Sequence, residues 1–288
     1  MSLGIRTNLS SIAAQRNLGE STGRLRTAYE RLSSGMRINR AKDDAAGLAI
    51  AESLKVDARV AQVGIRNAND GISIVAITDG AIGQITNILS RLGELAEESA
   101  NGVYSNGQRS ALQLEFSALL SEVERIALST EFNGVKLLSG GTNVTFQVGF
   151  DGSSISQISY SGVQATLQAL GLAQIGTSTA TYSITGATEM DSQSASRIAL
   201  DAIRVAITSV TRNRGTLGAV ESRLETTINN LTVARENFMA AESVIRDVDV
   251  AAESAELTRL TILQQAGTAI LAQANQQPRL ALQLLQGG

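Results

Sequence analysis

The sequence predicts a mainly α-helical protein, with long amphipathic helices at both ends and a small β-hairpin region in the middle. Three observations lead to this fold class. The only proline among the 288 residues is Pro278, and proline interrupts helices because it lacks an N–H and clashes with the preceding turn. Apolar residues recur at helical spacing over long stretches. Aromatic residues make up only 3 % of the chain while 43 % is hydrophobic, so the helices are expected to pack through aliphatic side chains.

The N-terminal segment combines a short apolar stripe with positive charge. Residues 1–42 hold eight Lys and Arg residues against two Glu, a net charge of +6 in a chain whose total is −3. An Arg-rich, acid-poor amphipathic start is also typical of mitochondrial transit peptides. Nucleic-acid binding is a weaker alternative, because stacking aromatic residues are almost absent. The stripe consists of Leu18, Leu25, Tyr29, Leu32 and Met36.

The strongest periodic signal lies between Val56 and Leu95. One row of apolar residues alternates spacings of three and four, and a second row is spaced by seven. Two adjacent rows give the broad apolar face of a helix in a bundle. We therefore expect a helix over 56–99, with Asn101-Gly102 as its stop signal. The first row is Ile74, Ile77, Ala81, Ile85, Ile88, Leu92 and Leu95, and the second is Val75, Ile82 and Leu89.

A second helix is predicted next, and it ends at Phe132-Asn133-Gly134. Its apolar face consists of Leu112, Phe116, Leu119, Val123 and Ile126. After it, the apolar residues from Val144 to Phe150 alternate with polar or small residues, which is the period of a strand. Asp151-Gly152 is a type I′ hairpin signal, and the polar run 153–160 is a candidate return strand.

Residues 161–190 are rich in Ser, Thr, Gly and Ala and show no strong period. This composition predicts a surface excursion that is not part of the core.

The helical stripe resumes at Ile203 and continues, less regularly, to Ala274. Both ends of the chain are thus long amphipathic helices, and isolated helices are marginal in water without tertiary burial. Their apolar faces must pack against each other or against neighbouring copies. The sequence therefore predicts a self-assembling structural subunit.

Residues suited to catalysis are scarce. The chain has no His and no Cys, which removes imidazole bases, thiol nucleophiles and the usual zinc ligands. The acidic pairs Glu97-Glu98 and Glu122/Glu124 are expected on solvated helix faces. Asp43-Asp44 has too few ligands for calcium, and Ser139-Gly140-Gly141 lacks the Lys-Ser/Thr of a phosphate loop. We expect no enzyme, no metal and no cofactor.

Membrane and targeting signals are also missing from the sequence. No run of 18 apolar residues occurs, so no membrane span is predicted. The N-terminus has no apolar h-region of a cleaved signal peptide.

Three segments together resemble bacterial flagellin. Residues 31–51 read Arg-Leu-Ser-Ser-Gly-Met-Arg-Ile-Asn-Arg-Ala-Lys-Asp-Asp-Ala-Ala-Gly-Leu-Ala-Ile-Ala, residues 66–74 read Arg-Asn-Ala-Asn-Asp-Gly-Ile-Ser-Ile, and residues 263–276 read Leu-Gln-Gln-Ala-Gly-Thr-Ala-Ile-Leu-Ala-Gln-Ala-Asn-Gln. The Phe132-Asn133-Gly134 turn and the Phe146–Gly149 strand are also similar to that family. The resemblance covers roughly 1–160 and 190–288.

The resemblance implies a division of the chain. Residues 1–43 and 237–288 would pair as a terminal coiled coil in the inner core of a filament. Residues 44–130 and 190–236 would form an outer-core bundle of long antiparallel helices. Residues 131–189 would be the β-hairpin and a short, surface-exposed variable segment. Many flagellins carry large outer domains at that point, so a slim filament is expected.

The implied function is that of a subunit that polymerises into the bacterial flagellar filament for swimming motility. The family's partners would be many copies of the same chain, the flagellar type III export apparatus, an export chaperone, and the filament cap and hook-junction proteins. The location would be extracellular, on the flagellum, with no cleaved signal peptide. Three alternatives remain: a hook–filament junction protein of the same family, a secreted coiled-coil adhesin, and a basic-tailed nucleic-acid-binding protein.

Two groups of residues are candidate sites. The first is an assembly seam in which small side chains would let helices approach closely, although an Ala-rich stretch also simply favours helix. The second is implied by the resemblance: the surface that an animal Toll-like receptor reads in flagellins. Leu95 also continues the apolar stripe, so packing is its other interpretation. The seam is Leu263, Ala266, Gly267, Ile270 and Ala274, and the receptor surface is Arg91, Leu95 and Glu122.

Overall fold

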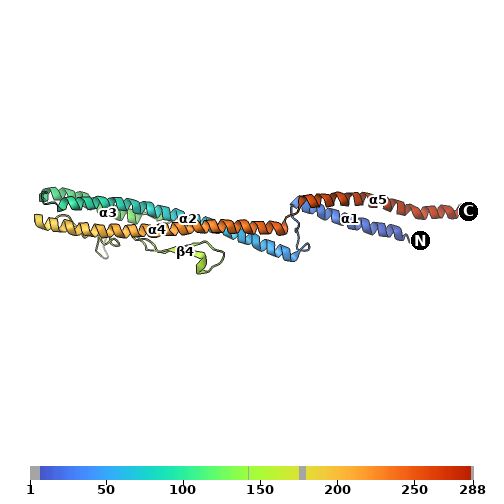
Figure 1. Cartoon of the computed structure of the whole chain (residues 1–288), viewed down its shortest axis with the longest axis horizontal. Coiled ribbons are helices and arrows are strands. Elements are labelled where there is room, and N and C mark those ends of the chain that lie inside the picture. The colour runs from blue at the N-terminus through green and yellow to red at the C-terminus, as the bar shows by residue number, and fades with distance from the viewer. Residues whose placement is uncertain (1–6, 142, 175–179, 287–288) are drawn as a thin grey trace. The chain divides into compact units, whose positions relative to one another are not determined.

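The computed structural model describes residues 7–141, 143–174 and 180–286 and confirms a mainly α-helical fold of long antiparallel helices (Figure 1). The chain divides into two compact units, unit 1 (1–58 and 236–288) and unit 2 (59–235), and α2 and α4 pass through both. The elements are α1 (Leu9–Ser34), α2 (Ala45–Ala100), α3 (Asn106–Ser129), β1 (Glu131–Phe132), β2 (Val135–Lys136), β3 (Val144–Gln147), the 3-10 turn η1 (Ser154–Ser156), β4 (Gln157–Tyr160), α4 (Glu189–Arg246) and α5 (Val250–Gln286).

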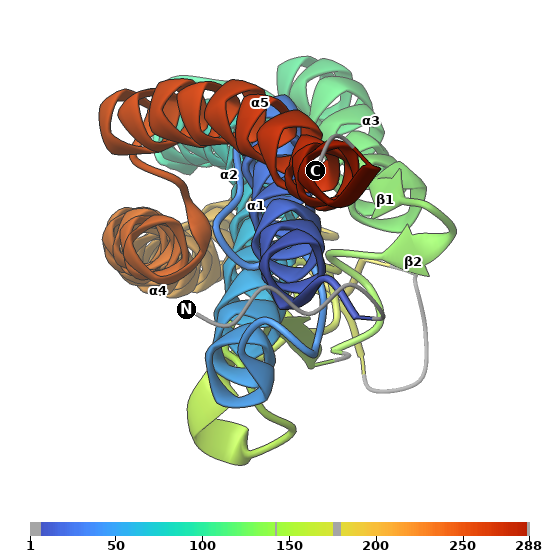
Figure 2. The same cartoon turned by 90° about the vertical axis from the view of Figure 1, so that its right-hand side faces the viewer.

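In unit 1, α1 lies antiparallel beside α5 (Figures 1 and 2). Leu25, Ala28 and Leu260 form the buried cluster of this pair. At the start of α1, the Asn8 carboxamide oxygen accepts from the Ser11 N–H at 3.0 Å, which caps the helix. Gly35 ends α1 with a φ of 72°, a left-handed conformation that glycine adopts without strain.

The two helix breaks of unit 1 are joined to each other. The Arg37 N–H donates to the Arg246 carbonyl at 2.6 Å, and the Val248 N–H donates to the Gly35 carbonyl at 3.0 Å. Met36 and Asp247 thereby form an antiparallel bridge. The link between α1 and α2 is thus tied to the link between α4 and α5.

Unit 2 is built on two facing heptad rows. Every residue of both rows is buried, and a spacing of seven keeps apolar residues on one helix face over many turns. The row spaced by seven is buried throughout, whereas the three-and-four row is fully buried at Ile85, Leu92 and Leu95 but 41 % exposed at Ile77. The α2 row is Ala61, Ala68, Val75, Ile82 and Leu89, and the α4 row is Ile203, Val210, Leu217, Leu224 and Leu231.

Helix α3 begins and ends at clear signals. Ser105 and Gln108 form a capping box at its start, and α2 ends at Ala100, directly before the predicted Asn101-Gly102 stop. The α3 residues Phe116, Leu120 and Val123 are buried in the same core as the α2 and α4 rows.

The structure contains two short antiparallel hairpins, β1–β2 and β3–β4. The β1–β2 turn is Asn133-Gly134, with φ values of 49° and 77°, as a type I′ turn requires. The second half of the predicted return strand (153–160) is confirmed as β4, with Val144 opposite Tyr160 and Gln147 opposite Gln157. The type I′ prediction at Asp151-Gly152 is wrong, because neither residue has a positive φ. Residues 148–156 form a longer loop that contains η1.

The prediction that 161–190 is a surface excursion outside the core does not hold for its apolar residues, although much of the stretch is exposed. Six apolar residues of this stretch are buried in the core of unit 2: Val163, Ala165, Leu167, Leu170, Leu172 and Ile184. Residues 175–179 lie outside the described part of the chain. The segment between β4 and α4 is therefore a part of the folded unit.

One finding bears on the expected absence of a membrane span. Helix α2 contains an 18-residue window with a mean hydropathy of 1.4, so by length and composition alone it could cross a membrane. No unbroken run of 18 apolar residues occurs in α2, because small and polar residues interrupt it, but its mean hydropathy over 18 residues is still high. A core helix of a helical bundle passes the same test.

Candidate assembly and recognition surfaces

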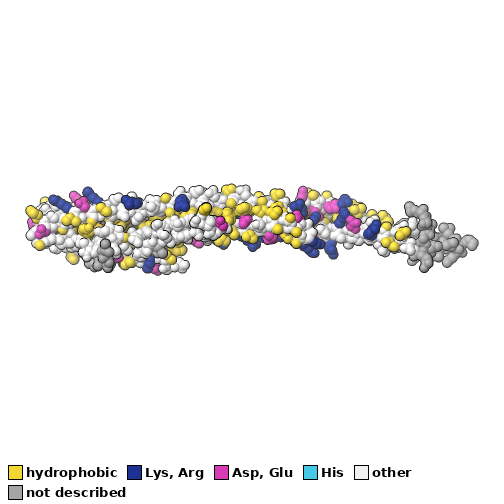
Figure 3. Space-filling model, turned by 90° about the horizontal axis from the view of Figure 1, so that it is seen from below, with side chains coloured by type: hydrophobic (Ala, Val, Ile, Leu, Met, Phe, Trp, Pro, Cys, Tyr) yellow, Lys and Arg dark blue, Asp and Glu magenta, His cyan; other side chains and the backbone are white. Residues whose placement is uncertain are grey.

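Unit 1 exposes more large hydrophobic side chains than it buries. Among its described residues three are buried, Leu25, Ile38 and Leu260, whereas eleven are exposed. Hydrophobic side chains also reach the surface on the face that Figure 3 shows. Contiguous exposed apolar surface usually marks an interaction site. The exposed residues on the terminal pair itself include Leu9, Ile12 and Tyr29 of α1 and Ile262, Leu263 and Ile270 of α5.

The predicted assembly seam divides into two faces of α5. Gly267 and Ala274 face α1. A methyl group on Gly267 would lie 3.3 Å from Leu18 Cδ1, and the Asn8 side chain donates to the Ala274 carbonyl at 2.8 Å. These two residues continue the row that begins at Leu260, at a spacing of seven. Their contacts with Leu18 and Asn8 hold α5 against α1 of the same chain.

The other seam residues point away from α1. Leu263 and Ile270 are 44 % and 61 % exposed, and Ala266 between them is also exposed. Their spacing of three and four gives one outward stripe on α5. This outward face, consisting of Leu263, Ala266 and Ile270, is the part of the seam that remains available to another molecule.

Acidic groups of the same unit partly neutralise the basic N-terminal segment. Arg40 Nη2 lies 2.7 Å from Glu30, and Arg31 Nη1 lies 3.8 Å from Glu253 of α5. The more exposed pair, Arg40 with Glu30, contributes little to stability. Both pairs do reduce the positive charge that a nucleic acid would meet.

The three predicted receptor residues are not equally accessible. Arg91 is exposed, and its Nε and Nη1 lie 2.8 Å from Glu115 and 2.9 Å from Glu94; these carboxylates raise the pKa of the guanidinium. Glu122 is partly exposed beside Arg125, which lowers the pKa of its carboxyl group. Leu95 is fully buried in the core of unit 2. This burial agrees with the packing interpretation of Leu95, while its role as a receptor contact stays a prediction.

The acidic doublet Asp43-Asp44 accepts hydrogen bonds from nearby backbone N–H groups. Asp43 Oδ2 accepts from the Arg40 N–H at 3.0 Å, a bond that lowers the pKa of the Asp43 carboxyl group. Asp44 Oδ1 accepts from the Gly47 N–H at 2.8 Å at the start of α2. Among the described residues, no group of three or more His, Cys, Asp or Glu could hold a metal ion.

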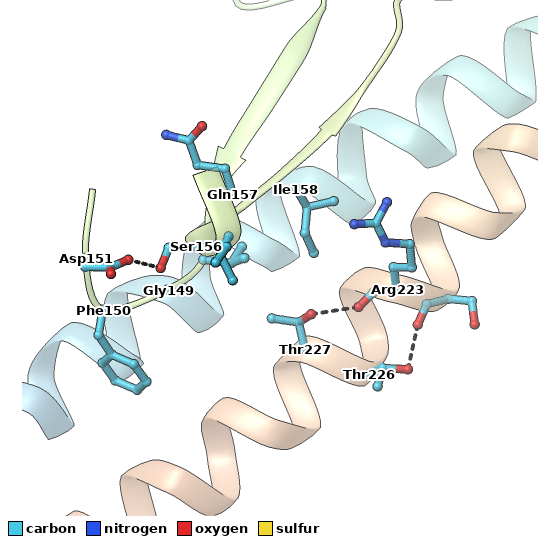
Figure 4. Close-up of a pocket in the computed structure, with 12 residues that line it drawn as sticks. Gly149, Phe150, Asp151, Ser156, Gln157, Ile158, Arg223, Thr226 and Thr227 are labelled. Carbon is cyan, nitrogen blue, oxygen red and sulfur yellow. Dashed lines mark hydrogen bonds between the residues drawn. The ribbon is translucent and has the colours of Figure 1, made fainter. Parts of the chain in front are cut away.

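A recess of about 560 Å³ lies between the β3–β4 loop and α4 (Figure 4). Asp151 is its only carboxylate, and this side chain accepts from the hydroxyls of Ser153, at 2.8 Å, and Ser156. These bonds lower the pKa of Asp151. Arg223, Thr226 and Thr227 line the α4 side. The hydroxyls of Ser153 and Ser156 hold the Asp151 carboxylate within the β3–β4 loop, so its hydrogen bonds shape that loop.

Family models match both ends of the chain. The model described as the bacterial flagellin N-terminal helical region matches residues 5–143, and the one described as the bacterial flagellin C-terminal helical region matches residues 200–285. Residues 144–199 lie between the two matches.

Curated proteins are similar over almost the whole chain. The flagellin of Halalkalibacterium halodurans is 43 % identical over 282 residues, which is 98 % of this chain and 99 % of that protein. The flagellar filament 30.7 kDa core protein of Treponema maltophilum is 38 % identical, and the flagellin of Bacillus subtilis is 39 % identical, each with the same two coverages. Among solved structures, Bacillus cereus flagellin is 24 % identical with a TM-score of 0.48, covering 58 % of this chain and 88 % of that one.

Proposed function

From the premise that this chain belongs to the bacterial flagellin family, we propose that it is the structural subunit of a flagellar filament that serves swimming motility. One feature of the structure supports self-assembly. In the terminal helix pair of unit 1, the outward face of α5 and much of α1 are exposed. Burying this surface against further copies would supply the missing core, because burial of apolar area drives most protein association.

The proposal assigns each part of the chain a place. Residues 1–43 and 237–288 would form the inner core of the filament, residues 44–130 and 190–236 its outer core, and residues 131–189 the outermost part. The subunit would be exported through the flagellar apparatus with a chaperone and would meet the cap and hook-junction proteins outside the cell. Its role is structural and not enzymatic.

Electron microscopy of the purified, concentrated protein tests the proposal. We expect filaments of micrometre length that form without added components and persist as salt is raised, because apolar contacts are not screened. Soluble oligomers alone would point to the adhesin, and growth only on preformed hook or filament ends would point to the junction protein. Binding to nucleic acid that falls steeply with salt would support the third alternative.

A second, narrower proposal concerns the receptor surface. We propose that Arg91 and Glu122 are contacts for an animal Toll-like receptor, because Arg91 is exposed and Glu122 is partly exposed. A reporter-cell assay on unassembled protein should show weaker signalling for Arg91→Ala and Glu122→Ala. Arg66→Ala, an exposed arginine on the same helix α2, is the matched control and should signal like wild type. Equal signalling by all four proteins would remove this proposal.

A further inference from the structure

The segment between β4 and α4 is held in unit 2 by polar groups of the helices as well as by its own apolar side chains. We call residues 163–174 and 180–188 the strap. Near its start the Ala165 N–H donates to the Leu138 carbonyl at 2.9 Å. The Leu167 N–H then donates to Glu124 Oε2 of α3 at 2.8 Å. An amide bonded to a carboxylate is among the stronger hydrogen bonds in proteins.

Ile184 is the strap residue that bonds to α2, α3 and α4. Gln113 of α3 accepts from the Ile184 N–H at 2.7 Å. The hydroxyls of Ser99 of α2 and Ser196 of α4 donate to the Ile184 carbonyl at 2.9 Å and 3.1 Å. The Ile184 side chain is fully buried. One strap residue is therefore bonded by a polar side chain from each of α2, α3 and α4.

A buried arginine holds the same end of unit 2. Arg109 of α3 is fully buried, and its guanidinium donates to three backbone carbonyls: Ser99 at 2.9 Å, Asn101 at 3.0 Å and Glu189 at 3.2 Å. Burying a charge is costly unless it is hydrogen-bonded, and here the partners lie at the end of α2 and the start of α4. The cation thus ties α3 to the point where the strap enters α4.

We propose that the strap is a conformational lock that fixes α3 against α2 and α4. Ile184 is its anchor, and the bond between Glu124 and the Leu167 N–H is a second attachment. Both acceptors, Gln113 and Glu124, belong to α3, so release of the strap frees α3 in particular. The proposal concerns the folding of unit 2 and is independent of whether the chain polymerises.

Hydrogen–deuterium exchange on the unassembled full chain tests the lock. In Gln113→Leu and Glu124→Ala we expect the amides of Ile184 and Leu167 to exchange about tenfold faster or more, because a buried donor loses its acceptor. Amides of α3 should accelerate with them, while the buried rows of α2 and α4 should not. Glu122→Ala is the matched control, since among the described residues Glu122 pairs with the exposed Arg125 and with no strap residue. Gln113→Glu and Glu124→Gln keep an acceptor oxygen and should stay within about threefold of wild type.

The lock is overturned if strap amides exchange in Glu124→Ala as they do in Glu122→Ala, or if α3 keeps its full protection when the strap loses its own. Ser99→Ala decides the matter if the larger substitutions prevent folding, because Ser196 still donates to the same carbonyl. Severalfold faster exchange over 180–188 is then expected, and unchanged exchange there contradicts the proposal.

Discussion

At the residue scale, two glycines of α2 decide where the β3–β4 hairpin docks. A methyl group on Gly64 would lie 3.0 Å from the Val148 carbonyl oxygen, and one on Gly71 would lie 3.2 Å from the Phe146 ring. Between them the Asn67 side chain donates to the Gln147 carbonyl at 2.8 Å. The spacing of seven was visible in the sequence, but glycines inside a helix do not show what approaches them.

Gly64→Ala should therefore destabilise unit 2, even though alanine favours helix. A backbone carbonyl at 3.0 Å cannot yield as a side chain would, and overpacking typically costs about 1–3 kcal/mol. Gly80→Ala is the matched control: it lies on the same helix with nothing within 4 Å, so it should raise the free energy of unfolding by about 0.5–1 kcal/mol. Urea unfolding followed by circular dichroism measures both. Equal stabilisation by the two variants would show that the hairpin does not press on α2 at Gly64.

At the scale of elements, α5 shows what sequence periodicity can and cannot separate. The helix carries an inner row (Leu260, Gly267 and Ala274) and the outward face (Leu263, Ala266 and Ile270). When a helix is apolar on several faces, its sequence does not show which face packs against another helix of the same chain. The sequence therefore predicted a single seam that included residues of both rows. Only the contacts with Leu18 and Asn8 distinguish the two rows.

Neighbouring substitutions should separate the functions of these rows. Ala266→Leu places a large side chain on the outward face, so the unassembled chain should keep its helicity while polymerisation is blocked by overpacking. Gly267→Leu directs the same side chain at Leu18, so it should lower the helicity of the unassembled chain as well. Circular dichroism and electron microscopy of the two variants provide the measurements. Normal filaments from Ala266→Leu would refute close packing at that position.

Where the prediction from sequence differs from the structure, tertiary contacts determine the conformation. The helices and β3 followed from periodicity, because burial of one face repeats along the chain. The strap has no period, and its Ser-, Thr- and Gly-rich composition is typical of surface loops. Its apolar residues are nevertheless buried in places, because Gln113, Glu124 and Ser196 on distant helices satisfy nearby backbone polar groups. Leu95 illustrates the same point for the candidate site, since four-residue spacing to Arg91 does not reveal that one side chain is buried and the other exposed.

At the scale of the whole molecule, the two units differ in how complete their cores are. Unit 2 buries heptad rows of two helices, much of α3, the β3–β4 hairpin and the strap in one cluster. The terminal pair of unit 1 buries a cluster of Leu25, Ala28 and Leu260, and eleven large hydrophobic side chains of unit 1 are exposed among its described residues. We therefore expect unit 2 to be stable alone. The terminal helices bury their exposed apolar side chains only against other copies of the chain.

Hydrogen–deuterium exchange of the same protein before and after polymerisation tests this claim most directly. In the dilute chain, amides of α1 and α5 should exchange quickly while the buried rows of α2 and α4 stay protected. In filaments, exchange of α1 and α5 should slow by on the order of a hundredfold, equivalent to about 2.8 kcal/mol of local stability, with little change in unit 2. Terminal helices that are as protected in the dilute chain as the unit 2 core, or that stay unprotected in filaments, would contradict the claim.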